Sequence, residues 1–339
     1  MNDFYQLDAQ GQAARMAHLA QAALAHWDIA AEAIALIKYR ENAVFQVTDR
    51  AGVRYALRIH RAEYHSDAQL RSELQWMRAL DHDGIAVPPV VPARDGSSFV
   101  VVATEGVPEP RQVDVFTWVA GEQLGSVEVA GQLNAPVSDS YRTIGTLAAR
   151  LHNQAVGWQL PEGFERHSWD AHGLAGEEPL WGRFWELAAL SPAQRVTLLQ
   201  ARERVFEGLQ RYAAAPENSG RYSLIHADFV AENLLVQGDD VRLIDFDDSG
   251  FGWHLFEIAT ALFFEKDEPH YPEALAALLA GYREHRELPA SQVAQLPLFY
   301  AARSFTYLGW VHTRRETETA RQMTPMLIDK AFRVIGEYN

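Results

Sequence analysis

Short apolar runs alternate with polar residues between positions 224 and 250, and this pattern constrains the fold more than any other part of the chain. The apolar residues at 223–226 predict one short strand. Two further strands are predicted at 234–236 and 241–245, joined by the polar turn at 237–240. A turn this short makes the last two strands neighbours in an antiparallel hairpin.

Three polar residues stand at the ends of these strands. Asp228 and Asn233 belong to the loop after the first strand, with four residues between them, and Asp245 ends the third strand. Because a hairpin brings its base together, Asn233 and Asp245 are expected side by side, next to the loop that carries Asp228. Two oxygen donors at such a point suit Mg²⁺, and Asp228 can accept the proton of an attacking hydroxyl. This order matches the catalytic loop and the metal-binding Asp of kinases.

The competing explanation for this segment is an ordinary polar turn. Asp and Asn are common turn residues, so the His-x-Asp sequence that ends at Asp228 carries little weight by itself. Asp247 and Asp248 also fit a solvated turn. Three elements in the correct order, each bounded by apolar strands, favour a metal–phosphate site over that explanation.

The composition bounds the class of protein. A chain of 339 residues, 48% of them apolar, is long enough for one large or two modest domains with a sizeable core. It contains no cysteine, which excludes disulfides, thiolate chemistry and cysteine-based metal sites. No signal-peptide pattern and no apolar run of the ~18 residues that a membrane span needs are present. We therefore expect a cytoplasmic enzyme without a membrane partner.

The net charge of −15 argues against a nucleic-acid surface, which would be basic. Much of this charge is local, because residues 224–270 hold eleven acidic and two basic side chains. Such a field attracts Mg²⁺ and cationic substrates. Solubility through surface charge explains part of it equally well.

Patterns elsewhere predict an α+β chain in two parts, with the boundary near 118–121. The first part reads as an antiparallel sheet with helices: helix 11–27, strands 33–40, 44–48, 53–60, 98–103 and 112–119, a turn at Glu41 and Asn42, and a helix that follows the capping pair Ser66 and Gln69 and ends near Leu80. The second part is mostly helical, with helices predicted at 138–156, 180–189, 192–213, 254–264, 271–285, 291–313 and 324–337.

Four motifs together resemble the phosphotransferase enzyme family, the group that contains aminoglycoside phosphotransferases and type II homoserine kinases. They are His226-Ala-Asp228-x4-Asn233, Ile244-Asp245-Phe246-Asp247-Asp248, Gly145-x-Leu147-Ala148-x-x-Leu151-His152 and Phe116-Thr117-Trp118-Val119-x-Gly121. The resemblance covers most of the chain. It implies a two-lobed, protein-kinase-like α+β fold with a nucleotide-binding lobe at 1–117, a hinge at 116–121, and a mostly helical lobe at 118–339 that carries the catalytic hairpin.

The resemblance also implies roles for particular residues. Asp228 would be the catalytic base, and Asn233 and Asp245 would be the Mg²⁺ ligands. ATP would lie between the lobes, with its adenine edge on the backbone of the hinge from Phe116 to Trp118.

In the small lobe, the resemblance places Arg58 on the strand that grips the phosphates and Glu73 on the helix that pairs with its cation. Most kinases have Lys where this chain has Arg58, and an ion pair without a ligand is the alternative for these two residues. Lys38, on an earlier strand, is a weaker substitute. The phosphate-covering turn has no glycines, but the backbone at Asn42 and Ala43 offers N–H groups. An ordinary hairpin turn explains those two residues at least as well.

Other positions also depart from the usual motifs. Asp247 replaces the glycine of protein kinases, so it is either a further carboxylate near the metal or part of a solvated turn. Glu257 stands where relatives usually carry Asp, and a carboxylate there can hold the catalytic loop by its backbone N–H groups. His226 is expected to support that loop structurally. Arg303 belongs to an aromatic-rich helix that more often forms core than substrate pocket.

These features favour an ATP- and Mg²⁺-dependent kinase acting on a hydroxyl of a small, amine-bearing metabolite such as a homoserine-, choline- or aminoglycoside-like compound, in a monomer or homodimer. The alternatives are a Ser/Thr protein kinase of the stress-response type and a nucleotide-binding pseudokinase. Ala227 stands in place of the Arg that reads a phosphorylated activation loop, and the link from Asp245 to the next helix is short. Both observations weigh against the protein kinase.

Overall fold

The computed structural model describes residues 4–39, 42–125, 133, 135–238 and 240–338. Arg40 and Glu41, of the first predicted strand and turn, and Asp239, of the hairpin turn, lie outside these residues. Contacts divide the chain into two compact units. The first unit comprises Met1–Glu122, Leu160–Glu165 and Leu235–Ile244, and the second comprises Gln123–Gln159, Arg166–Leu234 and Asp245–Asn339. The chain is thus an α+β protein, as predicted, but its division is not a single cut in the sequence.

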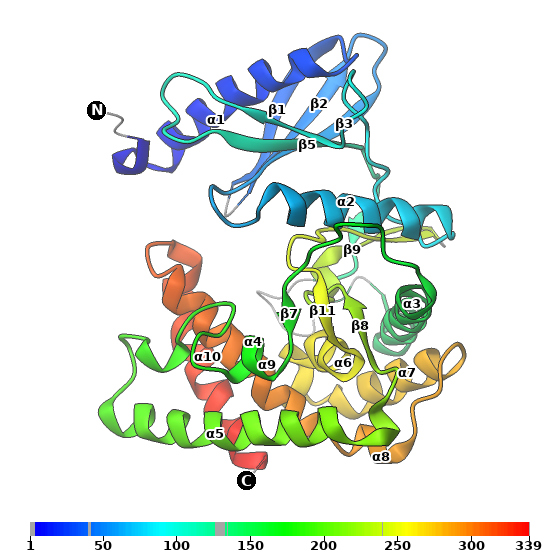
Figure 1. Cartoon of the computed structure of the whole chain (residues 1–339), viewed down its shortest axis with the longest axis vertical. Helices are drawn as coiled ribbons and strands as arrows, with labels where there is room; N and C mark the ends of the chain where they lie inside the picture. Colours follow the sequence, from blue (N-terminus) through cyan, green and yellow to red (C-terminus); the bar gives the residue numbers. More distant parts are fainter. Residues whose placement is uncertain (1–3, 40–41, 126–132, 134, 239, 339) are drawn as a thin grey trace. The chain divides into compact units, whose positions relative to one another are not determined.

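The first unit is built on a five-stranded antiparallel sheet in the order β1-β2-β3-β5-β4. Its strands are β1 (Ala31–Tyr39), β2 (Ala43–Asp49), β3 (Arg54–Ile59), β4 (Phe99–Val102) and β5 (Arg111–Thr117). Helix α1 (Ala9–Ala23) lies along one face of the sheet and buries Met16, Leu19 and Ala20 with the apolar strand residues in one core (Figure 1). In the β3–β5 ladder Arg58 stands opposite Asp114.

Helix α2 (Asp67–His82) also belongs to the first unit, and its capping box confirms the predicted start. The Ser66 hydroxyl accepts from the Gln69 N–H and the Gln69 side chain accepts from the Ser66 N–H, both at 3.1 Å. These bonds satisfy two of the N–H groups that a helix start leaves unpaired. The buried face of α2 is apolar except at Ser72 and Glu73, and the Glu73 side chain is fully buried.

The second unit is mostly helical: α3 (Val137–Gly157), α4 (Ala171–Ala175), α5 (Pro192–Ala214), α6 (His254–Leu262), α7 (Tyr271–Arg283), α8 (Ala290–Val293), α9 (Leu296–Thr313) and α10 (Glu318–Glu337). Helix α9 packs against α6 and α10 (Figure 1). Helices α3 and α7 approach closely through glycines. A Cβ on Gly145 would lie 2.0 Å from the Leu278 carbonyl oxygen, and one on Gly281 would lie 2.1 Å from that of Arg142. Among the described residues, no helix has the length and apolar character to cross a membrane.

Two short strands of the second unit, at Ser168–Trp169 and Gly250–Trp253, were not predicted. Strand β11 (Gly250–Trp253) pairs antiparallel with β8 (Tyr222–Ile225) and parallel with β7 (Ser168–Trp169). Glycine has a low strand propensity, so residues 250–253 gave no strand signal. Crowding favours glycine at Gly250, since a Cβ there would lie 2.7 Å from the His167 carbonyl oxygen.

Three helix predictions were wrong in extent. The segment 291–313 forms two helices, α8 and α9, because Pro297 has no N–H to continue a helix and instead lies in the first turn of α9. The segment 180–189 forms only a 3-10 turn at Phe184–Glu186, because Gly182 adopts a left-handed φ of 94° that a helix does not accept. Helix α10 begins at Glu318, earlier than predicted, because Thr317 caps it through the Ala320 N–H and the helix accommodates Pro325 in its interior.

The predicted hairpin forms from β9 (Leu234–Gln237) and β10 (Asp240–Leu243). The sequence placed it in the large lobe, but Leu235–Ile244 groups with the first unit by its contacts. The Leu243 N–H donates to the Ala86 carbonyl at 3.0 Å, which ties the hairpin to the segment after α2. Asn233 and Asp245, at its two ends, belong to the second unit.

Candidate active site

The loop that carries Asp228 begins with a strained residue. Strand β8 ends at Ile225, His226 follows, and Ala227 takes a left-handed φ of 64° although it has a Cβ. A non-glycine residue in this region costs on the order of 1–3 kcal/mol and persists only where its surroundings hold it. The side chain of Ala227 is fully buried. The position of Asp228 therefore depends on contacts that fix the backbone before it.

Glu257, in the first turn of α6, supplies part of that support. Its carboxylate accepts the His226 N–H at 2.8 Å and the Ala227 N–H at 2.7 Å. The side chain is fully buried, where bonds to a charged acceptor are strong. The expectation that a carboxylate at this position holds the loop by its N–H groups is confirmed, and Glu does so with its longer side chain.

Asp228 and Asn233 are in direct contact, a pair that the hairpin argument did not specify. The Asn233 amide nitrogen donates to the Asp228 carbonyl and to its Oδ2, both at 2.8 Å. Asn233 is buried, whereas 29% of the Asp228 side chain is exposed. One oxygen of the carboxylate is thus anchored while the group keeps access to a reactant.

The other oxygen of Asp228 is held by Arg303 of α9, at 3.1 Å from Nη2. Nη1 of Arg303 donates to the Ala227 carbonyl at 3.0 Å, and Nη2 also donates to the Tyr307 hydroxyl at 2.9 Å. Burial opposes the charge of Arg303, but Tyr307 and Asp228 together raise the pKa of the guanidinium. Burial raises the pKa of Tyr307 to about 12, although Arg303 acts against it, so this hydroxyl is neutral.

Sequence reasoning gave Arg303 no role, because it is 75 positions from Asp228 and lies among aromatic residues. The signal that was available is a charged residue in the middle of an otherwise apolar helix. Such a charge is buried only with partners.

The loop that follows Asp245 is held through its carbonyl groups. Arg166 donates to the carbonyls of Asp247 and Ser249, both at 2.6 Å. The side chains of His167 and Trp169 contact the Asp248 carbonyl at 3.1 and 2.9 Å. Asp245 itself is exposed and has a left-handed φ of 66°. This second loop is therefore positioned by one neighbouring segment, residues 166–169.

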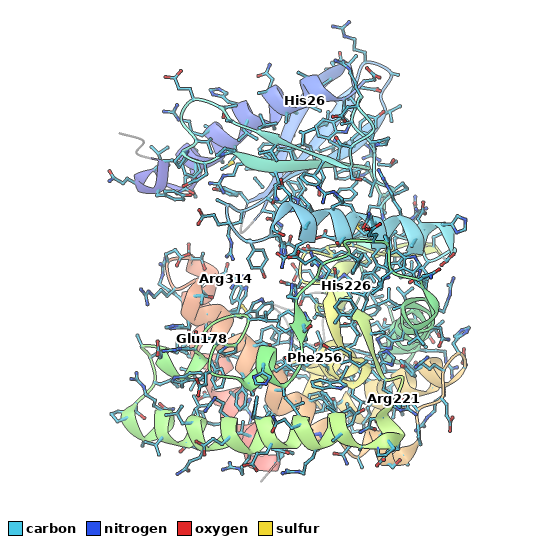
Figure 2. All side chains as sticks on the ribbon, in the orientation of Figure 1. His26, Glu178, Arg221, His226, Phe256 and Arg314 are labelled. Atoms are coloured by element: carbon cyan, nitrogen blue, oxygen red, sulfur yellow. The ribbon has the colours of Figure 1, made fainter. Side chains whose placement is uncertain are left out.

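His226 connects the two loops as a structural residue, as predicted. Its ring, buried in the interior of the second unit (Figure 2), packs edge-on against Phe246 at 4.6 Å and against Phe229 at 5.8 Å between centroids. The residue after Asp245 thus packs on the residue that begins the Asp228 loop. The loops share one apolar support.

Arg58, in the first unit, forms the predicted ion pair with Glu73, with Nη2 2.7 Å from Oε1. Asp114, which the sequence did not single out, adds a two-pronged pair through Nε at 3.1 Å and Nη2 at 2.7 Å. His60 contacts the same Asp114 carboxylate at 2.9 Å. Burial alone would raise the pKa of Asp114, but Arg58 and His60 hold it below its usual value. Arg58 is therefore fixed between two buried carboxylates.

The hinge segment is bonded differently from the expectation. The Trp118 N–H donates to the Arg54 carbonyl at 3.1 Å, so it is used within the first unit. The Thr117 N–H donates to the Pro89 carbonyl at 2.9 Å. In an antiparallel pair the second residue would donate its N–H in return, but Pro89 has no N–H with which to bond the Thr117 carbonyl. Phe116 is buried, with its ring 5.1 Å from the Arg58 guanidinium carbon.

Asn42 also has a structural contact in the first unit. Its side-chain oxygen accepts the Arg61 N–H at 3.0 Å. The side chain therefore connects the start of β2 to the end of β3. The prediction of a phosphate contact concerns the backbone N–H groups of this turn, which this side-chain bond does not involve.

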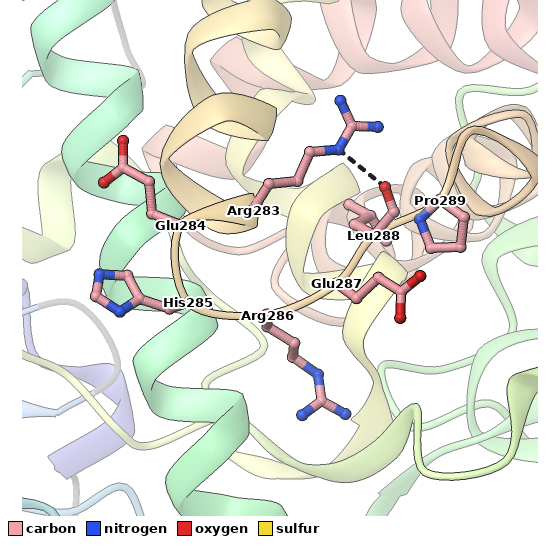
Figure 3. Close-up of a pocket in the computed structure, with 7 residues that line it drawn as sticks. All are labelled: Arg283, Glu284, His285, Arg286, Glu287, Leu288 and Pro289. Atoms are coloured by element: carbon pink, nitrogen blue, oxygen red, sulfur yellow. Dashed lines mark hydrogen bonds between the residues drawn. The ribbon is translucent and has the colours of Figure 1, made fainter.

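Among the hollows lined by described residues of the second unit are two that include no predicted site residue. One, of about 380 Å³, is lined by the loop from Arg283 to Pro289, which the Arg283 bond to the Leu288 carbonyl closes at 2.9 Å (Figure 3). The other, of about 490 Å³, lies between α4 and α5 and is lined by four glutamates with His172, Gly176, Arg202 and Phe206.

Known proteins resemble this chain over most of its length. The sequence model of the phosphotransferase enzyme family matches residues 32–290. A solved structure of a microcompartment-associated aminopropanol kinase is 34% identical, with a TM-score of 0.80 over 94% of this chain and 95% of that one. An amicoumacin kinase, solved in complex with AMP-PNP, Ca²⁺ and a compound abbreviated Ami, is 20% identical, with a TM-score of 0.73 over 98% of this chain and 95% of that one. A homoserine kinase of Sinorhizobium medicae is 28% identical over 76% of this chain and 72% of its own.

Proposed function

The chain belongs to the phosphotransferase enzyme family and is a small-molecule kinase, and from this premise we propose that it transfers the γ-phosphoryl group of ATP to the hydroxyl of a small amino alcohol. The observation that carries the proposal is the Asp228–Asn233 contact in a loop whose backbone N–H groups are bonded to Glu257. A carboxylate fixed in this way and still 29% exposed is suited to meet a hydroxyl.

In this proposal Asp228 orients the acceptor hydroxyl and takes its proton as the oxygen attacks. Each oxygen of a carboxylate has two acceptor sites, so the bonds from Asn233 and Arg303 leave one site on each oxygen for the hydroxyl. Phosphoryl transfer depends mainly on positioning and on charge neutralisation. The fixed orientation of Asp228 contributes the first of these.

Asn233 and Asp245 would hold Mg²⁺. The donor set fits this ion, because Asn233 directs its amide nitrogen to Asp228 and so turns its carbonyl oxygen away from that carboxylate. Asp245 is an exposed carboxylate at the end of the hairpin. Two oxygen ligands from the protein, with phosphate and water, are what Mg²⁺ commonly takes. When bound, the ion would neutralise phosphate charge.

Arg58 would contact the ATP phosphates from the first unit, with Glu73 and Asp114 fixing its guanidinium. The predicted adenine contact with the backbone from Phe116 to Trp118 is changed in one respect. The Trp118 N–H is already used, so we propose the Thr117 carbonyl as acceptor and the N–H of Val119 as donor.

The amine in the acceptor is supported by two independent observations. Residues 224–270 carry eleven acidic and two basic side chains, a field that favours a cation. The aminopropanol kinase is 34% identical over nearly the whole chain. Homoserine, choline and aminoglycosides remain the comparison compounds, since each bears both an amine or ammonium group and a hydroxyl.

The test is a transfer assay with Mg²⁺-ATP against 1-amino-2-propanol, ethanolamine, choline, homoserine, an aminoglycoside and a protein substrate such as casein. We expect phosphorylation of an amino alcohol that Asp228→Asn abolishes while ATP binding is kept. Transfer to the protein alone, or full turnover by Asp228→Asn, would refute the proposal. Asn233→Ala and Asp245→Asn should raise the Mg²⁺ concentration needed for half-maximal rate.

A further inference from the structure

We infer that Arg303 is a positioning residue of the phosphoryl transfer, which orients Asp228 and, together with Glu257, holds the backbone before it. The inference rests on the assignment of Asp228 as base proposed above. Its starting point is that one guanidinium contacts both the side chain of Asp228 and the carbonyl of Ala227.

The two contacts have different consequences. The Ala227 peptide groups are held from two helices, since Glu257 of α6 accepts the N–H and Arg303 of α9 donates to the C=O. A residue at φ 64° stays there only under such support. Arg303 therefore fixes the backbone from which the Asp228 side chain starts.

The second contact fixes the side chain itself. Arg303 bonds to Oδ1 of Asp228 and Asn233 bonds to Oδ2. Rotation of the carboxylate about its terminal torsion, which is otherwise soft, would break both bonds. The acceptor sites that face the substrate thus keep one direction.

Arg303 acts through Asp228 and has no direct contact with a reactant, because its side chain is fully buried. Its guanidinium carbon lies 5.3, 5.5 and 4.2 Å from the ring centroids of Trp181, Phe256 and Tyr307. These rings enclose the cation and let it stack. The planar guanidinium bonds to three acceptors and lies near three aromatic rings, and an ammonium group does not reproduce this geometry.

The test compares Arg303→Met and Arg303→Lys with a matched control, Lys330→Met. Lys330 is also a buried cation of the second unit, paired at 2.8 Å with Asp267, whose side chain is 31% exposed. For each variant kcat, the KM of both substrates, ATP binding and the melting temperature are measured. The acceptor is the compound of the panel that reacts best. If none reacts, ATP hydrolysis is measured, in which water is the acceptor.

We expect Arg303→Met to lower kcat about 100-fold, a typical share for a general base, with KM values and ATP binding within about threefold. Arg303→Lys should recover about tenfold of that loss, because it restores one bond to Asp228. Lys330→Met should lower the melting temperature and leave kcat within about threefold. A folded Arg303→Met with normal kcat, or equal kcat losses in Arg303→Met and Lys330→Met, would overturn the inference.

Two further variants separate the possible failures. If Arg303→Met does not fold, Tyr307→Phe removes only the hydroxyl that shares Nη2. It should lower kcat severalfold at unchanged KM, and an unchanged kcat would count against the role. In Asp228→Asn, adding Arg303→Met should cause little further loss. Turnover retained by Asp228→Asn refutes the base assignment, whereas a dead Asp228→Asn beside a fully active Arg303→Met refutes only the role of Arg303.

Discussion

Glu257 accepts the N–H of Ala227 at 2.7 Å, so a buried carboxylate of helix α6 holds the one left-handed residue that directly precedes Asp228. The same carboxylate accepts the His226 N–H. A side chain without contact to any reactant therefore fixes the course of the loop.

Glu257→Gln should lower both the free energy of unfolding and kcat. The amide keeps the size of Glu257 but can accept only one of the two N–H groups and turns its own NH₂ toward the other. Hydrogen bonds to a charged group are each worth about 1.5–3 kcal/mol, so a loss of that order is expected in a denaturant titration. A displaced loop should lower kcat about 100-fold. Glu257→Asp keeps the charge and should retain more activity than Glu257→Gln; the reverse order would contradict this account.

Gly145→Ala should lower stability, because the new methyl group would lie 2.0 Å from a carbonyl oxygen of α7. Overpacking of this kind costs about 1–3 kcal/mol, measurable as a lower melting temperature. Gly157→Ala is the matched control on the same helix, since nothing lies within 4 Å of the added Cβ. It should leave stability unchanged or slightly higher. Equal effects of both substitutions would show that the close approach of α3 and α7 does not matter.

Stability should fall as the pH drops below about 6.5, because two histidines are buried in the second unit. His152 and His254 stack with centroids 4.0 Å apart. Burial lowers the pKa of His152, and burial together with the neighbouring His152 lowers the pKa of His254 well below its usual value. The unfolded chain takes up these protons near pH 6.5, so the stabilising contribution is complete above that pH and is lost below it. Each histidine contributes a slope of about 1.4 kcal/mol per pH unit.

The charged and titratable groups that face this histidine pair are Glu257 of α6, Tyr282 of α7, and the arginines Arg221 and Arg286. Denaturant titrations between pH 5 and 8 should show a shallower slope for His152→Gln than for the native chain. His285→Gln, at an exposed position, should leave the slope as it is. A native slope of zero below pH 6.5 would be incompatible with neutral, buried histidines.

Arg58→Lys tests whether the cation between Glu73 and Asp114 serves ATP. An ammonium group cannot bond both carboxylates as the fork does, so it should sit differently against the phosphates. We expect the Kd of Mg²⁺-ATP to rise about tenfold, equivalent to about 1.4 kcal/mol. Arg94→Lys, at an exposed pair with Asp28, should leave ATP binding unchanged. Unchanged binding in Arg58→Lys would favour an ion pair without a ligand.

The sequence predicted what depends on neighbours along the chain. The capping box at Ser66 forms as expected, because its partner is three residues away. The hairpin of β9 and β10 also forms where the short polar turn predicted it, because the two strands follow each other directly.

Contacts between distant segments were not foreseeable from local patterns. Asp114 meets Arg58 only because β3 and β5 pair in one register, and nothing local to either residue specifies that register. Arg303 reaches Asp228 through the packing of α9 under the loop. Strand β11 forms because residues 250–253 pair with β7 and β8, and a Cβ at Gly250 would lie only 2.7 Å from a backbone oxygen. Each of these depends on tertiary packing that overrides local propensity.

The strain at Ala227 sets stability and turnover against each other in this protein. Glycine accepts a φ of 64° at no steric cost, so a selection for heat resistance alone would favour Ala227→Gly. The same substitution would make the backbone that Glu257 and Arg303 hold more mobile, and the Asp228 side chain would no longer keep one position. Alanine at this position therefore favours turnover over heat stability, and a more heat-stable version of this chain would need to gain its stability elsewhere.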